Sequence, residues 1–567
     1  MVVAAIAEVV SLGAVLPFLG MLASPDTVLK YPLIQEVERI LGGGRERLVV
    51  FFTVMFIVAA VVAGAVRLLL LWATTRVAFS AGSDLSIDLY RRTLHQPYEA
   101  HISRNSSAVL SGVGKVGGAM NILSQCLILA SSLILMVAIA AALLAMDPLV
   151  AIVSIVGFGL SYSAITFIAR HKLRRNGSII ANEQTRVFKI LQEGLGGIRD
   201  VLLDGTQKIY CDVYQQADLP LRRAQGNNLF IAASPRFVME TLGLVMIAVL
   251  ALVLSKQPEG ITASLPMLGA LALGAQRLLP ALQQAYGAWA TIVGSQASLA
   301  DTIDLLEQPI RAEMLQSAPE PMQFREAIRF KGVNFRYTED GPWVVRNLDF
   351  IIPKGSRIGL VGATGSGKST TLDILMGLLT PTEGQLLIDG YSLDGDLMRA
   401  WRRTIAHVPQ SIYLSDASFI ENIAFGIPLE QIDFERVKLA AKQAQIADFI
   451  ESCPQGYRTP VGERGMRLSG GQRQRVGIAR ALYKQASVLV FDEATSALDN
   501  ATERSLMESI EALNRDLTIL LVAHRLTTVR QCDVVVEIKD GSIHAQGDYD
   551  SLLRKSASFR RLAGEAT

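Results

Sequence analysis

The stretch RIGLVGATGSGKST, residues 357–370, decides the fold of the region around it. Residues 357–362 have the apolar character of a buried strand, and they run directly into GATGSGKST (362–370), which has the spacing GxxxxGK[ST]. The glycines of such a loop let backbone N–H groups converge on phosphate oxygens at a helix N-terminus. The pattern therefore predicts a phosphate-binding loop between a strand and a helix.

Two side chains of this loop carry the expected chemistry. Lys368 should reach the terminal phosphates of a nucleotide, and the Ser369 hydroxyl should bind Mg²⁺. The other loop residues are expected to surround the phosphates: Gly362, Ala363, Thr364, Gly365, Ser366, Gly367 and Thr370.

A second element follows at VLVFDE (488–493), where four apolar residues precede two acids. Buried strands often end in acids, so this pattern alone is weak. Together with the loop upstream, it predicts that Asp492 holds Mg²⁺ and that Glu493 polarises an attacking water. ATP and Mg²⁺ are the expected ligands.

The composition of the whole chain points to lipid as well as water. Half of the 567 residues are apolar, 19% are charged and the mean hydropathy is +0.34, whereas an ordinary globular chain carries about 25% charged residues. The net charge of +2 argues against a polyanionic partner, so no nucleic-acid partner is expected. The four cysteines are scattered without CxxC spacing, which is typical of reduced packing residues.

Six apolar runs in the first part of the chain are long enough to cross a bilayer, which takes about 20 residues. Six runs of this length argue against buried core helices. The predicted spans are about 1–23, 48–72, 120–145, 148–169, 229–255 and 260–294. The first run lacks the basic n-region and cleavage site of a signal peptide. Because the chain starts almost inside it, we expect a start that is either truncated or mis-assigned.

Basic residues predict the orientation of these spans. The long segments 73–118 and 170–228 are rich in arginine, whereas the connections at 146–148 and 255–259 are nearly free of basic residues. By the positive-inside rule the long segments and both chain ends lie in the cytoplasm. Three further short elements are expected: an external amphipathic helix at 33–41, and short helices at the turning points of the two long cytoplasmic segments, near 95–103 and 204–214.

The segment LSGGQ (468–472) resembles the signature of ATP-binding cassette (ABC) ATPases, and other motifs of that family stand in order around it. Tyr337 resembles the aromatic residue that stacks on adenine, Gln410 in HVPQ the residue that contacts Mg²⁺, and His524 in VAHRL the switch histidine. TPVGERG (459–465) and SALD (496–499) are similar to the loop before the signature and to the D-loop.

This resemblance covers essentially the whole chain and implies the fold class and a catalytic set. The expected architecture is multidomain: an all-α six-helix transmembrane domain of ABC exporter type (1–310) and an α/β P-loop nucleotide-binding domain (325–567). The catalytic residues implied are Glu493, His524 and Gln410, and the Mg²⁺ ligands are Ser369, Gln410 and Asp492.

In this family the signature of one chain completes the ATP site of another. A single copy of each motif therefore implies a homodimer, with a heterodimer as the alternative, in the cytoplasmic membrane. The residues expected from the partner are Leu468, Ser469, Gly470, Gly471, Gln472 and Asp499.

Cargo is the harder question, and ionisable residues at membrane depth are the best clue. Arg67, Arg236 and Arg277 could form an anion-binding lining, because a guanidinium grips phosphate bidentately. In the alternative reading, Arg236 and Glu240 neutralise each other one turn apart, and Arg67 snorkels to the interface.

The membrane half is similar to the flippases for lipid-linked oligosaccharides and to related polysaccharide exporters. The similar segments are AEVVSLGAVLPF (7–18), AASPRFVMETLG (232–243) and GAQRLLPA (274–281). This similarity implies a lipid-linked saccharide or another amphiphile as cargo, gripped at its pyrophosphate by the arginines. A multidrug, lipid or peptide exporter stays open as an alternative, and an ATP-gated channel or regulatory subunit as a remote one.

Overall fold

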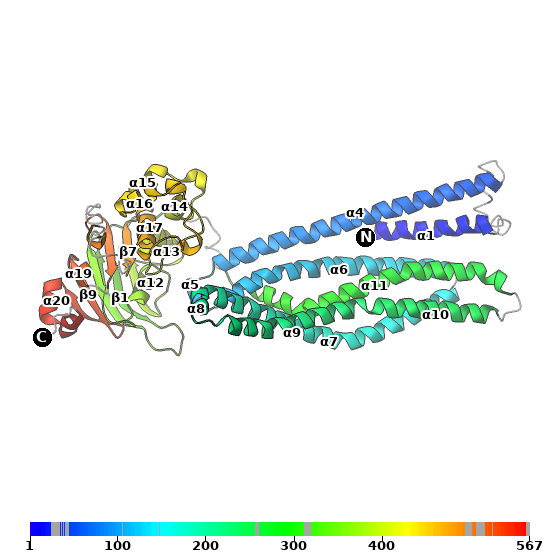
Figure 1. The fold of residues 1–567 in the computed structure, drawn as a ribbon, viewed down its shortest axis with the longest axis horizontal. Helices are drawn as coiled ribbons and strands as arrows, with labels where there is room; N and C mark the ends of the chain where they lie inside the picture. The colour runs from blue at the N-terminus through cyan, green and yellow to red at the C-terminus, as the bar shows by residue number, and fades with distance from the viewer. Residues whose placement is uncertain are drawn as a thin grey trace. The chain divides into compact units, whose positions relative to one another are not determined.

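The computed structural model describes residues 1–23, 35, 37, 39, 45–104, 106–146, 148–255, 260–310, 319–493, 502–505, 508, 516–523 and 526–562. The chain divides into two compact units, which Figure 1 draws. The N-terminal unit comprises Met1–Gln96 and Arg104–Ile310, and the C-terminal unit comprises Pro97–Ser103 and Arg311–Thr567. The short segment Pro97–Ser103, which the sequence analysis places in the membrane domain, thus belongs to the C-terminal unit.

The N-terminal unit is helical, and its long helices continue far beyond the apolar runs. Helix α4, for example, contains 50 residues, or about 75 Å at 1.5 Å per residue. The helices of this unit are α1 (Val2–Ala23), α4 (Arg45–Leu94), α6 (Ser106–Met146), α7 (Pro148–Gly196), α8 (Ile198–Leu203), α9 (Gln207–Ala233), α10 (Pro235–Ser255) and α11 (Gly260–Leu306). Helix α11 packs along α6 and α7, while α1 packs along α4.

Two segments among the described residues, Glu46–Leu94 and Val109–Ala145, are long and apolar enough to cross a membrane by length and composition. They contain the second and third predicted spans. Of the other four predicted spans, three fall on α1, α7 and α11, whereas the span 229–255 begins in the last part of α9 and continues along α10. Large apolar side chains such as Leu68 (70% exposed) and Trp72 (64% exposed) lie on the outer surface of α4, where a lipid environment would suit them.

The predicted short elements differ in their outcome. Helix α5 (Tyr98–Ser103) lies inside the predicted segment 95–103. The second short helix, α8, ends at Leu203, before the predicted 204–214, because Gly205 adopts a left-handed conformation (φ 62°) that interrupts the helix. The predicted external helix at 33–41 lies mostly outside the described residues.

The C-terminal unit contains two sheets. A four-stranded antiparallel sheet has the order β2-β1-β4-β5, and its strands are β1 (Ala327–Phe335), β2 (Val345–Pro353), β4 (Glu383–Ile388) and β5 (Tyr391–Ser392). A six-stranded sheet has the order β10-β9-β3-β8-β7-β6. Its strands are β3 (Arg357–Val361), β6 (Ile405–Val408), β7 (Val488–Asp492), β8 (Thr518–Val522), β9 (Val534–Lys539) and β10 (Ser542–Gly547).

All neighbouring pairs of the second sheet are parallel except β9 and β10. Its central strands are buried along nearly their whole length, which explains their continuous apolar sequences. Besides α5, the helices of this unit are α12 (Lys368–Leu375), α13 (Gly395–Thr404), α14 (Phe419–Ile423), α15 (Phe434–Gln443), α16 (Ala447–Ser452), α17 (Gly470–Tyr483), α19 (Leu526–Val529), α20 (Tyr549–Lys555) and α21 (Ala557–Leu562).

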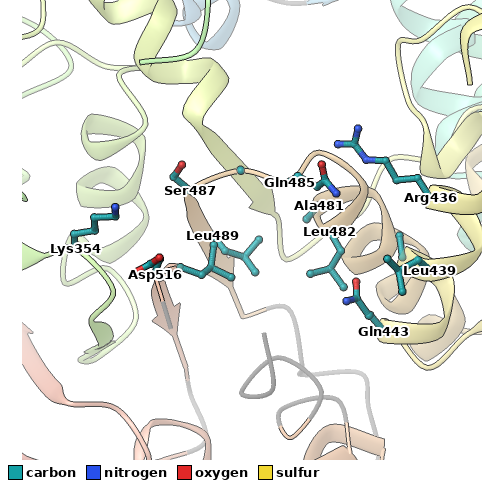
Figure 2. A pocket seen from close by; sticks show the side chains of 13 residues that line it. Lys354, Arg436, Leu439, Gln443, Ala481, Leu482, Gln485, Ser487, Leu489 and Asp516 are labelled. Carbon is teal, nitrogen blue, oxygen red and sulfur yellow. The ribbon is translucent and has the colours of Figure 1, made fainter. Parts of the chain in front are cut away.

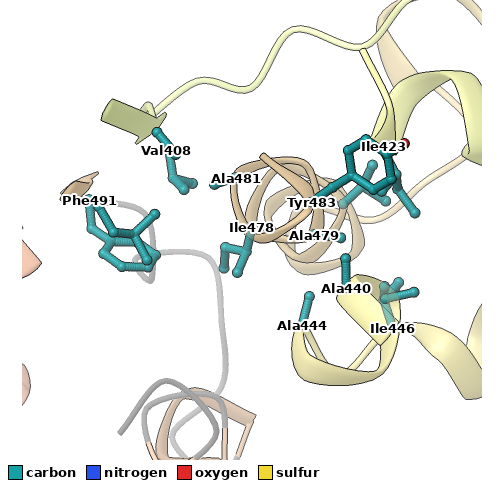
Figure 3. Packing of buried hydrophobic residues seen from close by; sticks show 14 of the residues in the cluster. Val408, Ile423, Ala440, Ala444, Ile446, Ile478, Ala479, Ala481, Tyr483 and Phe491 are labelled. Atoms are coloured by element: carbon teal, nitrogen blue, oxygen red, sulfur yellow. The ribbon is translucent and has the colours of Figure 1, made fainter. Parts of the chain in front are cut away.

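Helix α17 is the link between this sheet and the helices beside it. Figure 3 shows its side chains, including Ile478 and Tyr483, among apolar residues from both sides. Val408 of β6 and Phe491 of β7 belong to this cluster on the sheet side, and Ala440 of α15 on the helical side. The helix that begins directly after Ser469 is therefore anchored in a dry core.

Candidate nucleotide-binding site

The predicted site residues converge at the carboxyl edge of the parallel sheet. Strand β8 lies between β3 and β7. The loop that follows β3 therefore lies on one side of the end of β8, and Asp492, at the end of β7, lies on the other side. Strand β6 pairs with β7 in parallel and ends two residues before Gln410. Ligands of open α/β sheets bind at this edge.

The loop at 362–367 requires its glycines for space as well as for conformation. Gly367, which caps α12, has φ 100°. A Cβ atom on Gly362 (φ 154°) would lie 2.2 Å from the backbone oxygen of Ile538. Ser366 is buried, and its hydroxyl has no hydrogen-bond partner among the described residues. The loop thus presents close-packed backbone and an unused hydroxyl, which fits a phosphate ligand.

Lys368 is held over this loop. Its ammonium donates to the carbonyl oxygens of Gly362 and Ala363, both at 2.9 Å. Burial lowers the pKa of Lys368, while the nearby carboxylates of Glu493 and Asp492 oppose that shift. A partly desolvated cation held at a phosphate-binding loop interacts strongly with an incoming anion, because little water screens it.

Glu493 and Gln410 come from different strands and meet directly. The Gln410 side-chain amide donates to the Glu493 carboxylate at 2.7 Å. The Glu493 backbone is fixed by a hydrogen bond to the carbonyl oxygen of Val522, at the end of β8, and it adopts an unusual positive φ of 51°. A carboxylate at this edge, in contact with Gln410, can act as a general base.

The three side chains predicted to bind Mg²⁺ have ligand atoms that suit this ion. Ser369 and Gln410 are exposed and Asp492 is half-buried, so a hydroxyl, an amide oxygen and a carboxylate can supply hard oxygen ligands. Among the described residues there is no cluster of three or more histidine, cysteine or acidic side chains. Mg²⁺ is usually bound through one or two carboxylates together with substrate phosphates.

One acidic neighbour was not identified from the sequence. Burial, together with the charge of Asp492, raises the pKa of Asp373 on α12 to about 6. Nothing in the local sequence distinguishes Asp373 from an ordinary helical aspartate, because its environment depends on how α12 lies against the end of β7.

Tyr337 lies beside the same helix. Its hydroxyl is 3.2 Å from the Thr370 hydroxyl, and its ring packs edge-on against Phe335. The side chain is 52% exposed, so its ring has a free surface for stacking on a base. Tyr98 of helix α5 lies near Tyr337 and Asp373. Burial of its ring, together with these two neighbours, raises the pKa of Tyr98. Glu99 accepts a hydrogen bond from the Thr380 backbone at 3.2 Å.

The signature segment (468–472) forms the start of α17. Leu468 is buried, and Ser469 and Gln472 form a capping box, in which each side chain accepts a hydrogen bond from the other's backbone. Gly470 and Gly471 form the first turn. The spacing S-x-x-Q signals such a box, so this local structure could have been predicted from the sequence. The helix N-terminus leaves backbone donors for an anion.

Two predicted site residues lie outside the described residues. They are His524, the switch histidine, and Asp499 of the D-loop. Their roles stay predictions from the family resemblance.

Two of the three predicted cargo arginines have carboxylate partners in the same chain. Arg67 of α4 forms an ion pair with Glu8 of α1, which is 1% exposed. Arg236 pairs with Glu240 at 2.8 Å, one turn apart on α10. The side chain of Arg277, on α11, is outside the described residues. The pairing of Arg236 and Glu240 matches the alternative given in the sequence analysis, whereas Arg67 has a partner that the sequence analysis did not assign.

The comparisons with known proteins agree with this site. Residues 345–496 match the family model for the ABC transporter. The ATP-dependent lipid A-core flippase of Chromohalobacter salexigens is 39% identical over 272 residues, 48% of this chain and 46% of that protein. The protein of the same name from Alkalilimnicola ehrlichii is 31% identical over 408 residues, 72% of this chain and 68% of that protein.

The similarity also extends to solved structures. A structure described as a bacterial Atm1-family ABC exporter with ATP bound aligns at a TM-score of 0.76 and 25% identity, covering 98% of each chain. In sequence, the chain spans about half the length (46%) of the first curated relatives that it matches. The chain therefore belongs to the ABC transporter family and has the Atm1-type exporter fold, a helical N-terminal part joined to an α/β nucleotide-binding part.

Proposed function

We propose that this chain is one half of a homodimeric, ATP-driven exporter or flippase, which moves a lipid-linked saccharide or a similar amphiphile across the cytoplasmic membrane. The observation that carries the proposal is the contact between Gln410 and Glu493 at 2.7 Å, at the sheet edge where the loop of Lys368 begins. This arrangement holds a base, a cation and a phosphate loop together. The nucleotide-binding unit lies in the cytoplasm.

Each residue has a defined task in this proposal. Lys368 and the loop N–H groups bind the β- and γ-phosphates, Tyr337 stacks on the base, and Glu493 orients the attacking water while Gln410 positions the carboxylate. Mg²⁺, held by Ser369, Gln410 and Asp492, supplies electrostatic stabilisation of the phosphate charge when bound.

The second half of each ATP site comes from the partner chain. Ser469–Gly471 offer a helix N-terminus to the γ-phosphate that Lys368 of the other chain binds. ATP therefore joins the nucleotide-binding units of the two chains until hydrolysis removes the γ-phosphate. The predicted residues Asp499 and His524 complete this interface and the hydrolytic site. Helices α5 and α8 carry the motion to the membrane-spanning helices.

The cargo assignment rests on the names of the relatives and on the arginines of the helical unit. Several relatives are named lipid A-core flippases, which supports a lipid-containing amphiphile. The ion pairs that Arg67 and Arg236 form are within the chain, so a pyrophosphate would have to exchange with Glu8 or Glu240. Arg277, on α11, is the first residue to test.

The proposal is tested by a flipping assay with the full chain in liposomes. Fluorescent polyprenyl-pyrophosphate saccharide should be moved in the presence of Mg²⁺ and ATP, and Arg277→Ala should slow this movement while sparing basal ATP turnover. Arg67→Gln is combined with Glu8→Gln, because the two substitutions remove both charges of this buried ion pair together. Efflux of uncharged drugs at a comparable rate would favour the multidrug alternative instead, and passive ion current would favour a channel.

A further inference from the structure

A second cavity lies in the C-terminal unit, away from the nucleotide edge. It has a volume of about 450 Å³ and is lined by the residues that precede β7 and β8, by α15 and by the end of α17. These are the amino ends of the parallel strands, whereas the loop of Lys368 is at the carboxyl ends. A five-residue strand spans about 17 Å, so the cavity and the nucleotide site are separate.

The two walls of the cavity differ in chemistry. Figure 2 shows Lys354 and Asp516 on one wall and Arg436 on the other, with Leu482 and Leu489 between them. Two cations and one carboxylate give the lining a net charge of plus one. The leucines form an apolar floor, so the cavity suits a molecule with one acidic group and an apolar body.

Arg436 provides the strongest indication of a ligand. Its guanidinium stacks on the Tyr483 ring at 4.7 Å, which fixes its orientation. Its Nε is buried and has no hydrogen-bond partner among the described residues. A buried donor left without an acceptor costs about 1–3 kcal/mol. Arg436 also lines the cavity, so a carboxylate or sulfonate bound there would lie beside a cation whose orientation the Tyr483 ring fixes.

We propose that this cavity is a regulatory site for a small amphipathic monoanion. Its volume falls within the range of about 300–1,000 Å³ typical of small-molecule sites. The ligand would contact α15 and the end of α17 on one side and the starts of β7 and β8 on the other. Since α17 begins at the signature residue Ser469, a molecule wedged at its far end fixes the signature relative to the sheet and slows ATP turnover.

The binding test uses naphthalenesulfonate as the probe and the full chain in nanodiscs with ADP present. Equilibrium dialysis should show saturable binding, which Arg436→Gln weakens by about tenfold. Lys438→Gln is the matched control on the same helix, because its ammonium pairs with Glu435 and lies over Phe434; it should bind the probe as the wild type does. Leu439→Trp should exclude the probe by filling the cavity.

The outcomes separate the site from the proposed function. Absence of saturable binding, or equal binding by the Arg436 and Lys438 variants, would overturn the site. Neutral naphthalenemethanol binding as tightly would overturn the anion requirement. A second measurement, of ATP turnover, rests on the proposed function. The probe should slow ATP turnover by the wild type about fivefold and should not change turnover by the Leu439→Trp variant. Probe binding without any change in turnover would overturn the regulatory role alone.

Discussion

Glu493 connects the chemistry of the site to its geometry. We expect Glu493→Gln to lower ATP turnover by about 100-fold or more, because an amide orients water but cannot accept its proton, and a positioned base contributes about 10²–10⁴-fold. Phosphate release by the purified chain measures this. Nucleotide binding should be retained, since the phosphates are held by the loop and Lys368.

Lys368→Ala is the contrasting variant. It should weaken nucleotide binding itself by about 10- to 100-fold, because a hydrogen bond to a charged group is lost. If Glu493→Gln hydrolysed ATP within about twofold of the wild type, the assigned base would be wrong.

Asp373 predicts a pH dependence of stability for the nucleotide-free chain. Its pKa of about 6 in the folded protein lies above the ordinary 3.8, so the folded state prefers the protonated carboxyl. Stability from this group is therefore present at low pH and is lost as pH rises from about 4 to about 6. Asp373→Asn should stabilise the protein at pH 7.5, by no more than about 1 kcal/mol after solvent screening.

The gain for Asp373→Asn should shrink below pH 6, which thermal unfolding at several pH values can follow. Asp550→Asn, at an exposed position in the first turn of α20, is a suitable control. A gain that was the same at pH 5 and pH 7.5 would show that the carboxyl does not titrate in this range.

At the scale of elements, a buried ammonium joins three long helices. Lys115 of α6 donates to the Ala181 carbonyl and the Thr185 hydroxyl of α7, both at 2.9 Å, and to the Asp301 carboxylate of α11 at 2.5 Å. Lys115 is 4% exposed. Lys115→Met should destabilise the helical unit by about 1–3 kcal/mol, because three acceptors lose their donor.

A double-mutant cycle with Asp301→Asn isolates the ion pair, and thermal unfolding in detergent supplies the readout. A coupling energy of about 0.5–3 kcal/mol is expected for groups in direct contact. Lys189→Met on α7, where an exposed lysine pairs with Glu193 on the same helix, should have little effect. Equal losses for both lysine variants would contradict a special role for Lys115.

The sequence predicted these elements unevenly, for physical reasons. The loop of Lys368 and the strand before it are specified by adjacent residues, so local pattern was sufficient. The predicted spans 48–72 and 120–145 cover only the most apolar parts of α4 and α6. Both helices extend well beyond these spans, because the residues outside them still favour a helix although they are less apolar. The contact of Lys115 with Asp301 spans 186 positions, and no local pattern encodes it. The environment of Asp373 and the cavity near Arg436 depend likewise on tertiary packing.

For the whole molecule, the proposed sharing of ATP sites between two chains can be tested directly. A chain with Lys368→Ala and a chain with Ser469→Arg should each be inactive alone. Mixed dimers contain one site with both defects and one intact site, because each site joins the loop of one chain to the signature of the other. Co-reconstitution at equal amounts should therefore restore about a quarter of the wild-type turnover if sites are independent. No recovery would argue that each chain carries a complete site.

The placement of α5 also has a consequence for biosynthesis. Glu99 and Thr380, whose contact ties α5 to the C-terminal unit, are separated by 281 positions. At about 5–20 residues per second, a ribosome needs on the order of 15–60 seconds to travel between them. During that interval α5 has been synthesised but the residues that it contacts in the C-terminal unit have not, so α5 can join this unit only after the whole N-terminal unit has been made.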